Sequence, residues 1–206
     1  MKLGGFAKTR APILAQGPDA PYNTPAASVM AAISSVGLVQ VASEAKCVVE
    51  LVSRSPERTQ ALGKTLGENA LPGDVFLLVG GLGSGKTCLT QGVLWGLGSD
   101  EFARSPTFVL VSQYEGRHTL YHMDLYRLET FEEIVDLGLD EMLFGDGVSV
   151  VEWADKGAGA FPDAHLLIRM EYVDEETRRI SLRPFGSRYE ELVQAIKPAL
   201  AGWQET

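Results

Sequence analysis

The segment Gly80–Thr87 reads GGLGSGKT and has the residue types and spacing of a phosphate-binding loop. It fits the pattern G-x-x-x-x-G-K-[ST], whose glycines let the backbone approach phosphates and turn several N–H groups inward. In such loops the lysine, here Lys86, reaches the β- and γ-phosphates, and the hydroxyl of Thr87 binds Mg²⁺. The alternative is a glycine-rich turn with an incidental lysine. Because the motif follows an apolar strand pattern and opens a helix pattern, we predict that it binds ATP.

Two carboxylates stand at the ends of apolar segments elsewhere in the chain. Glu152 ends VSVVE and Asp124 ends LYHMD. Ligands of open α/β sheets bind at the carboxyl ends of strands, so both acids are expected near the loop. One acid would hold Mg²⁺, directly or through water, and the other would orient the attacking water; the residues do not say which does which. Each acid could instead be only a strand-end cap. The predicted catalytic residues are Lys86, Asp124 and Glu152, and the predicted metal ligands are Thr87, Asp124 and Glu152.

Three further positions have two interpretations each. The segment SPTF at 105–108 lies where P-loop proteins keep a γ-phosphate sensor, so Thr107 or Ser105 could supply a hydroxyl there. The alternative is a plain Ser-Pro turn. Trp153 follows Glu152 and lies either near the nucleotide or in the core. His122 alternates with core residues, and we interpret it as a structural strand histidine.

The surrounding pattern alternates between strands and helices. The run VFLLV at 75–79 is apolar throughout, as expected for a strand buried on both faces of a parallel sheet. Ser55 and Pro56 are typical of a helix N-cap and first turn, and Gly98 is a natural helix stop. The predicted strands are 47–53, 75–79, 107–115, 118–126, 148–153, 165–173 and 178–185. The first predicted helix begins after Ser55, and three further helices are predicted at 86–97, 131–143 and 187–200. Thr130 and Glu133 form a possible capping box at the start of the helix at 131–143.

Composition limits the class of protein. The chain has 206 residues, 45% of them hydrophobic and 22% charged, which fits one soluble domain with a core. Its net charge of −9 argues against a stand-alone nucleic-acid binder, because such binding rests on Lys and Arg at phosphates. No apolar run approaches the roughly 18 residues needed to cross a bilayer. The two cysteines, Cys47 and Cys88, have no metal-ligand spacing, so a reducing compartment is expected.

The N-terminal part differs from the rest. Four prolines interrupt residues 1–43, and Asp19 is the single acid in that stretch. We interpret 1–44 as a disordered extension and 45–206 as the P-loop ATPase domain. Two alternatives stay open: an organellar transit peptide, or a true start at Met30. The expected location is cytoplasmic, with organellar import as the alternative.

Four segments in order resemble the TsaE family, formerly YjeE: GDVFLLVGGLGSGKTCLTQGVLWGLG, SPTFVLVSQY, LYHMDLYRL and VVEWADKG. The resemblance covers about residues 50–185. It implies an α/β fold, a P-loop NTPase-like three-layer sandwich with a mostly parallel central sheet, and ATP and Mg²⁺ as cofactors. It also implies work with TsaB and TsaD, which transfer threonylcarbamoyl to adenosine 37 of tRNA. The chain would then meet tRNA only indirectly, through that complex.

The resemblance also suggests roles for individual residues. Asp124 matches the acid of the family's H-x-D-L-Y-R segment, and Glu152 matches the first acid of its E-W-P-E segment. Thr59, in SPERT, matches a threonine near the adenine. The residues then expected to contact nucleotide are Thr59, Gly80, Gly81, Leu82, Gly83, Ser84, Gly85, Lys86, Thr87, Cys88, Thr107 and Trp153.

The chain departs from the family pattern at two places. Gly81 stands where most members have Asp, and the later segment reads EWAD, so that its last acid is Asp155. Both departures leave the phosphate-binding pattern intact and concern the control of hydrolysis. The small single domain, together with the resemblance, predicts an ATPase that is weak alone and stimulated by its partners. A small-molecule kinase is one alternative, although no Arg-rich lid follows the loop helix. A non-catalytic nucleotide switch is the other.

Overall fold

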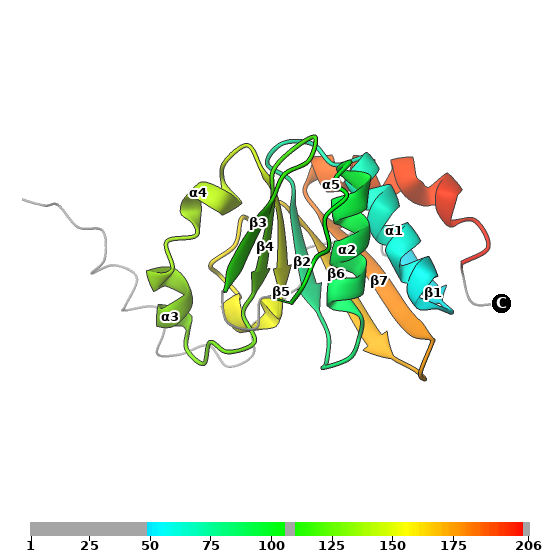
Figure 1. Ribbon diagram of the computed structural model, residues 1–206, viewed down its shortest axis with the longest axis horizontal. Helices are drawn as coiled ribbons and strands as arrows, with labels where there is room; N and C mark the ends of the chain where they lie inside the picture. Colours follow the sequence, from blue (N-terminus) through cyan, green and yellow to red (C-terminus); the bar gives the residue numbers. More distant parts are fainter. Residues whose placement is uncertain (1–48, 106–109, 204–206) are drawn as a thin grey trace, which may run out of the picture. The chain divides into compact units, whose positions relative to one another are not determined.

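The computed structural model describes residues 49–105 and 110–203. In this part of the chain a seven-stranded sheet has the order β1-β7-β6-β2-β5-β4-β3 (Figure 1). The four central strands, β6, β2, β5 and β4, run parallel, and the outer pairs are antiparallel. The strands are β1 (Val49–Ser53), β2 (Val75–Val79), β3 (Val111–Tyr114), β4 (Leu120–Asp124), β5 (Val148–Glu152), β6 (His165–Tyr172) and β7 (Arg178–Phe185). The parallel centre agrees with the predicted α/β architecture.

Helical segments cover the sheet on both faces. One core joins it to α1, α2 and α5, and a second core joins it to α3, α4 and η2. Their bounds are α1 (Pro56–Glu68), α2 (Lys86–Gly96), α3 (Phe131–Asp136), α4 (Asp140–Leu143), η2 (Ala154–Gly157) and α5 (Ser187–Ile196), which continues as η3 (Lys197–Leu200). The arrangement has three layers, as the sequence predicts.

Strand β2 is the centre of both cores. Phe76 and Leu78 point into the core of α1 and α2, whereas Val75 and Leu77 point into the core of α3 and α4. All four side chains are buried. The continuous apolar run of this strand thus reflects burial on both faces, as predicted.

Helices α1 and α2 lie side by side on the sheet (Figure 1) and touch through glycines. A Cβ at Gly63 would lie 2.1 Å from the carbonyl oxygen of Leu89, and a Cβ at Gly92 would lie 2.1 Å from that of Gln60. Gly67 and Gly96 make equally close approaches. Backbone-to-backbone packing therefore fixes α2, and the loop before it, against α1.

The predicted helix at 131–143 forms as two short helices, α3 and α4. Gly138 lies between them with φ +62°, a left-handed conformation that ends a helix. The capping box is present: the side chain of Thr130 accepts from the backbone of Glu133, and the carboxylate of Glu133 accepts from the backbone of Thr130. The start of this helix was therefore predicted correctly and its length was not.

Some sequence predictions lie outside the described residues. These are the extension at 1–44, the first residues of the strand at 47–53, and Thr107 with the beginning of the strand at 107–115. The predicted hairpin of the last two strands is confirmed: β6 and β7 pair antiparallel, with Met170 opposite Ile180. Helix α2 ends at Gly96, and Gly98 follows with φ +83°.

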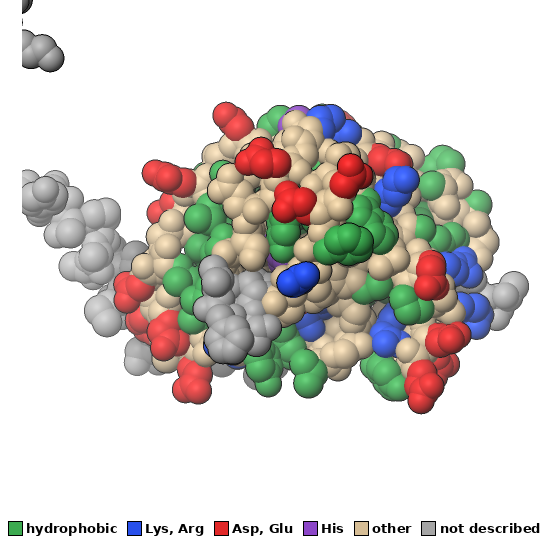
Figure 2. Space-filling view, viewed as in Figure 1, with side chains coloured by type: hydrophobic (Ala, Val, Ile, Leu, Met, Phe, Trp, Pro, Cys, Tyr) green, Lys and Arg blue, Asp and Glu red, His purple; other side chains and the backbone are tan. Residues whose placement is uncertain are grey.

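The surface around α3 and α4 is acidic (Figure 2). Its exposed acids are Glu132, Glu133, Asp136, Asp140 and Glu141. On the rest of the face seen in Figure 2, Lys and Arg side chains are interspersed with acidic ones. Among the described residues of this face, Lys and Arg side chains form no continuous basic surface along which a polyanion could bind.

Candidate functional site

The loop between β2 and α2 takes the conformation that its glycines permit. Gly83 and Gly85 have φ of +74° and +94°, which side-chain-bearing residues rarely adopt. A Cβ at Gly80 would lie 2.3 Å from the carbonyl oxygen of Met170 in β6. At Gly81 a Cβ would meet no atom within 4 Å, so a side chain fits at this position. The loop needs glycine at three positions and tolerates a larger residue at the fourth.

The ammonium of Lys86 is held by the loop itself. Its Nζ donates to the carbonyl oxygens of Gly80, at 2.8 Å, and Gly81, at 3.0 Å, and lies 3.4 Å from Oγ of Ser84. Burial lowers the pKa of Lys86, while the charges of Glu152, Asp124 and Asp155 act in the opposite direction. A phosphate entering the loop would offer this ammonium charged oxygens in place of neutral carbonyls.

Asp124 and Glu152 end two adjacent parallel strands. They are partners in the register of β4 and β5, so their carboxylates meet at the same edge of the sheet. Asp124 Oδ1 accepts from the backbone N–H of Tyr126 at 3.0 Å, and Oδ2 accepts from Oγ of Ser105 at 2.5 Å. The prediction that both acids lie at one edge of the sheet is therefore confirmed. The structure also shows that Ser105 is a hydrogen-bond partner of Asp124.

Glu152 is 2% exposed and has three side-chain neighbours with polar hydrogens. Thr87 Oγ1 donates to Oε2 at 3.1 Å. His122 Nε2 lies 2.8 Å from Oε1, and Thr90 Oγ1 lies 3.5 Å from the same oxygen. A buried carboxylate is costly unless it is hydrogen-bonded, and these contacts satisfy it.

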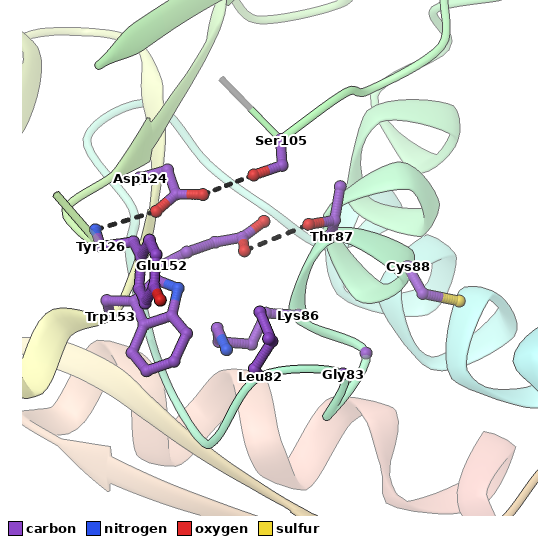
Figure 3. A pocket seen from close by; sticks show the side chains of 11 residues that line it. Leu82, Gly83, Lys86, Thr87, Cys88, Ser105, Asp124, Tyr126, Glu152 and Trp153 are labelled. Atoms are coloured by element: carbon purple, nitrogen blue, oxygen red, sulfur yellow. Dashed lines mark hydrogen bonds between the residues drawn. The ribbon is translucent and has the colours of Figure 1, made fainter. Parts of the chain in front are cut away.

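Trp153 covers Lys86. Its ring centroid is 3.9 Å from the lysine Nζ and 4.9 Å from the ring of Tyr126 (Figure 3). Trp153 is the one non-glycine residue with positive φ, +58°, in the part of the chain that the structure describes. Such strain persists only where the surroundings enforce it, and it gathers at functional sites. The backbone turn after Glu152 therefore directs this indole over the loop lysine.

These groups surround one cavity of about 300 Å³ (Figure 3). It is lined by Leu82, Gly83, Gly85, Lys86, Thr87, Cys88, Ser105, Asp124, Tyr126, Glu152 and Trp153. The volume is at the lower end of the range for small-molecule sites. A lysine, a threonine hydroxyl and two carboxylates converge on it, together with the N-terminus of α2. This set of groups suits a phosphate-bearing ligand with an accompanying cation.

Four of the described residues predicted to contact nucleotide do not line this cavity: Thr59, Gly80, Gly81 and Ser84. Thr59 is 2% exposed, and its hydroxyl is 2.8 Å from Oγ of Ser53. Ser84 belongs to the loop, and its side chain is buried next to Lys86. Cys88 lies on the wall, and burial raises the pKa of its thiol. The nucleotide contacts predicted for these residues stay predictions.

The sequence interpretation missed three neighbours of the site: His122, Thr90 and Tyr126. His122 is a buried strand residue as expected, but its bond to Glu152 was not foreseen. A signal was present, because residues two apart in a strand share a face and His122 precedes Asp124 by two. Thr90 lies one helical turn after Lys86 and gave a similar signal.

The family model "Threonylcarbamoyl adenosine biosynthesis protein TsaE" matches residues 53–180, more than half of the chain. The chain belongs to the TsaE family. It thereby belongs to a family of tRNA threonylcarbamoyladenosine biosynthesis, a process that involves protein partners.

Individual TsaE proteins are similar over most of their length. The tRNA threonylcarbamoyladenosine biosynthesis protein TsaE of Bacillus subtilis is 42% identical over 143 residues, covering 69% of this chain and 89% of the relative. The protein of the same name from Treponema pallidum is 40% identical over 131 residues, covering 64% and 97%.

A solved structure gives the same fold. The crystal structure of YdiB from Bacillus subtilis superposes with a TM-score of 0.65 at 34% sequence identity and covers 74% of this chain and 96% of YdiB. The predicted P-loop NTPase-like fold of this TsaE-family chain is thereby confirmed. Within the described residues, no helix is long and apolar enough to pass through a bilayer.

Proposed function

We propose that this chain binds ATP together with Mg²⁺ and hydrolyses it, in support of the protein complex that makes threonylcarbamoyladenosine at position 37 of tRNA. One observation carries the proposal. Lys86 and Thr87, at the start of α2, share a cavity with the carboxylates that end β4 and β5. A phosphate-binding loop beside two such acids is the arrangement that phosphoryl transfer to water requires.

The residues around the cavity have different roles in this proposal. Lys86 binds the β- and γ-phosphates in place of its present carbonyl partners. The carboxylates of Asp124 and Glu152 lie where one can orient a water molecule and the other can help to hold the cation. Trp153 and Tyr126 line one side of the cavity, and their rings are in contact.

The donor set fits Mg²⁺ only as an ion shared with ATP. The described residues contain no group of three or more His, Cys, Asp or Glu that could hold a metal alone. Mg²⁺ is usually bound through one or two protein oxygens plus substrate phosphates, and Thr87, Asp124 and Glu152 offer such oxygens. When bound, the ion neutralises charge that develops on the phosphate oxygens.

We further propose that TsaB and TsaD are the partners, and that tRNA is met only through them, in the cytoplasm. The support is family membership, together with the acidic surface, which opposes direct binding of a phosphate backbone. A small P-loop domain often gains a stabilising cation from a partner, worth about 10³–10⁵ in rate where it occurs. Hydrolysis is therefore expected to be slow in the isolated chain.

A phosphate-release assay tests the proposal. The purified chain is supplied with ATP and Mg²⁺, alone and with the TsaB–TsaD pair, next to a Glu152→Gln variant. Slow release alone, faster release with the pair, and little release from the variant would support a partner-stimulated ATPase. Full turnover by the isolated chain would contradict partner dependence.

The same assay separates the two alternatives. A small-molecule kinase would transfer the γ-phosphoryl group of ATP to an acceptor molecule and not to water. Without that acceptor, addition of the TsaB–TsaD pair would produce no inorganic phosphate. A nucleotide switch would bind the pair in an ATP-dependent manner without forming ADP. A pull-down of the pair with ATP, with ADP and without nucleotide completes the comparison.

A further inference from the structure

The buried side of Glu152 is occupied by a histidine that lies outside the cavity wall. His122 is fully buried in β4 and places Nε2 2.8 Å from Oε1 of Glu152. Leu120, on the same face of the strand, belongs to the apolar core of α1 and α2. An apolar residue at position 122 would continue that core. The polar ring therefore calls for a reason beyond packing.

The surroundings of the two ring nitrogens indicate which of them carries the proton of neutral His122. Its Nδ1 is buried and has no partner among the described residues. A proton on Nδ1 would be a buried, unsatisfied donor, whereas a bare Nδ1 is only an unused acceptor. The proton then belongs on Nε2, where the carboxylate of Glu152 accepts it.

His122 is the principal donor to Oε1. Thr90 has one hydroxyl proton and two acceptors in reach, the carbonyl oxygen of Lys86 at 3.0 Å and Oε1 of Glu152 at 3.5 Å. The shorter bond takes the proton. Thr87 holds the other oxygen, Oε2, but its hydroxyl also faces the cavity. If Thr87 turns to a ligand, the His122 bond is what still fixes the carboxylate.

We infer that His122 is a positioning residue for Glu152: its Nε2–H fixes Oε1, so that Oε2 stays directed at Thr87 and the cavity. The ring is itself held by its strand neighbours and by Tyr114, whose ring lies 6.5 Å away at 30°. His122 touches no ligand in this scheme and acts only through the carboxylate. The inference rests on the proposed function for what Glu152 does, but not for how it is held.

A matched pair of variants tests this role. His122→Gln keeps an amide N–H that can reach Oε1, and His122→Leu has nearly the same size without a donor. With the TsaB–TsaD pair present, His122→Leu is expected to bind ATP within about threefold of wild type. Its kcat should fall about 10–100-fold, as for partners that orient a functional ligand. His122→Gln should recover most of the kcat. His118→Gln, a change at a partly exposed histidine, is the control.

Equal loss of kcat in the Gln and Leu variants would overturn the positioning role, since any harm would then come from packing alone. Melting temperatures of both variants accompany the assay. If they fall together while only the Leu variant loses kcat, a merely structural role is excluded.

A second measurement does not depend on hydrolysis. The chain has three histidines, so ¹⁵N NMR of the imidazoles can be assigned with the His122→Gln and His118→Gln variants. The His122 signals are expected to show a protonated Nε2 and a bare Nδ1. A bare Nε2, with the ring proton on Nδ1 alone, would contradict the inference. If no ATP is hydrolysed under any condition but His122 carries its proton on Nε2, the proposed function fails. The positioning of Glu152 by His122 would then still be supported.

Discussion

The loop lysine is already satisfied by hydrogen bonds before any ligand is considered. Lys86 donates to two loop carbonyls and lies under the ring of Trp153. A phosphate bound here, as proposed, would have to replace these contacts, and a charged acceptor forms the stronger hydrogen bond. The loop is thus preorganised around the position of the ammonium.

Lys86→Ala is expected to weaken ATP binding about 10- to 100-fold, because hydrogen bonds to charged groups contribute roughly 1.5–3 kcal/mol. Titration with a fluorescent ATP analogue measures the change. Lys64→Ala removes an exposed lysine of α1 and serves as the control. Unchanged affinity in the Lys86 variant would mean that the loop is not the nucleotide site.

Trp153 is expected to report on nucleotide binding. Its indole lies over Lys86 and beside Tyr126, so displacement of the lysine changes the surroundings of the ring. Tryptophan fluorescence is measured on adding ATP with Mg²⁺ to wild type and to Trp153→Phe. The wild type should respond and the variant should not. The same response in both would assign the signal to Trp95 or Trp203.

At the scale of the elements, the contact between α1 and α2 positions the whole loop. Glycines on both helices meet backbone atoms of the other helix at distances that no Cβ allows. In a lone helix, a change from Gly to Ala stabilises by about 1 kcal/mol. Here the same change is expected to destabilise the fold, because the new Cβ would clash with a backbone atom of the other helix, which cannot rotate away.

Gly92→Ala is expected to lower the free energy of unfolding by about 1–3 kcal/mol, which corresponds to a fall of several degrees in Tm. Thermal denaturation followed by circular dichroism measures it. Gly81→Ala is the matched control, since a Cβ there meets open space. An unchanged or raised Tm for Gly92→Ala would show that the helices separate at little cost.

At the scale of the whole molecule, charge decides which partners can bind directly. The net charge is −9, and the surface around α3 and α4 is acidic. Affinity for a nucleic acid depends on the number of cationic contacts to its phosphates. Protein surfaces can be matched by shape and by complementary charge, so a protein complex is a better direct partner than tRNA.

The isolated chain is therefore expected to leave tRNA unshifted in a native gel at physiological salt. Addition of the TsaB–TsaD pair should produce a shifted band that antibodies to this chain supershift. A tRNA shift by the chain alone that weakens as salt rises would contradict indirect contact.

Most of the elements, and the chemical groups at their ends, could be predicted from the sequence alone. The apolar run at 75–79, the glycines of the loop and the start of α2 are local patterns, and local patterns specify strands, turns and helix starts. These patterns are the basis of the prediction that Gly80–Thr87 is a phosphate-binding loop. The helix at 131–143 was misjudged because its acids and apolar residues keep helical spacing across Gly138, and the glycine outweighs them.

The contacts between these groups could not be predicted from the sequence, because they depend on how the strands pair. The parallel register of β4 on β5 sets Asp124 beside Glu152 and brings His122 within hydrogen-bonding distance of that glutamate. The positive φ of Trp153 turns its ring over Lys86. Such contacts join residues 28 to 67 positions apart in the numbering. Sequence periodicity reports the face on which a side chain lies, but strand register and backbone turns fix its neighbours across the sheet.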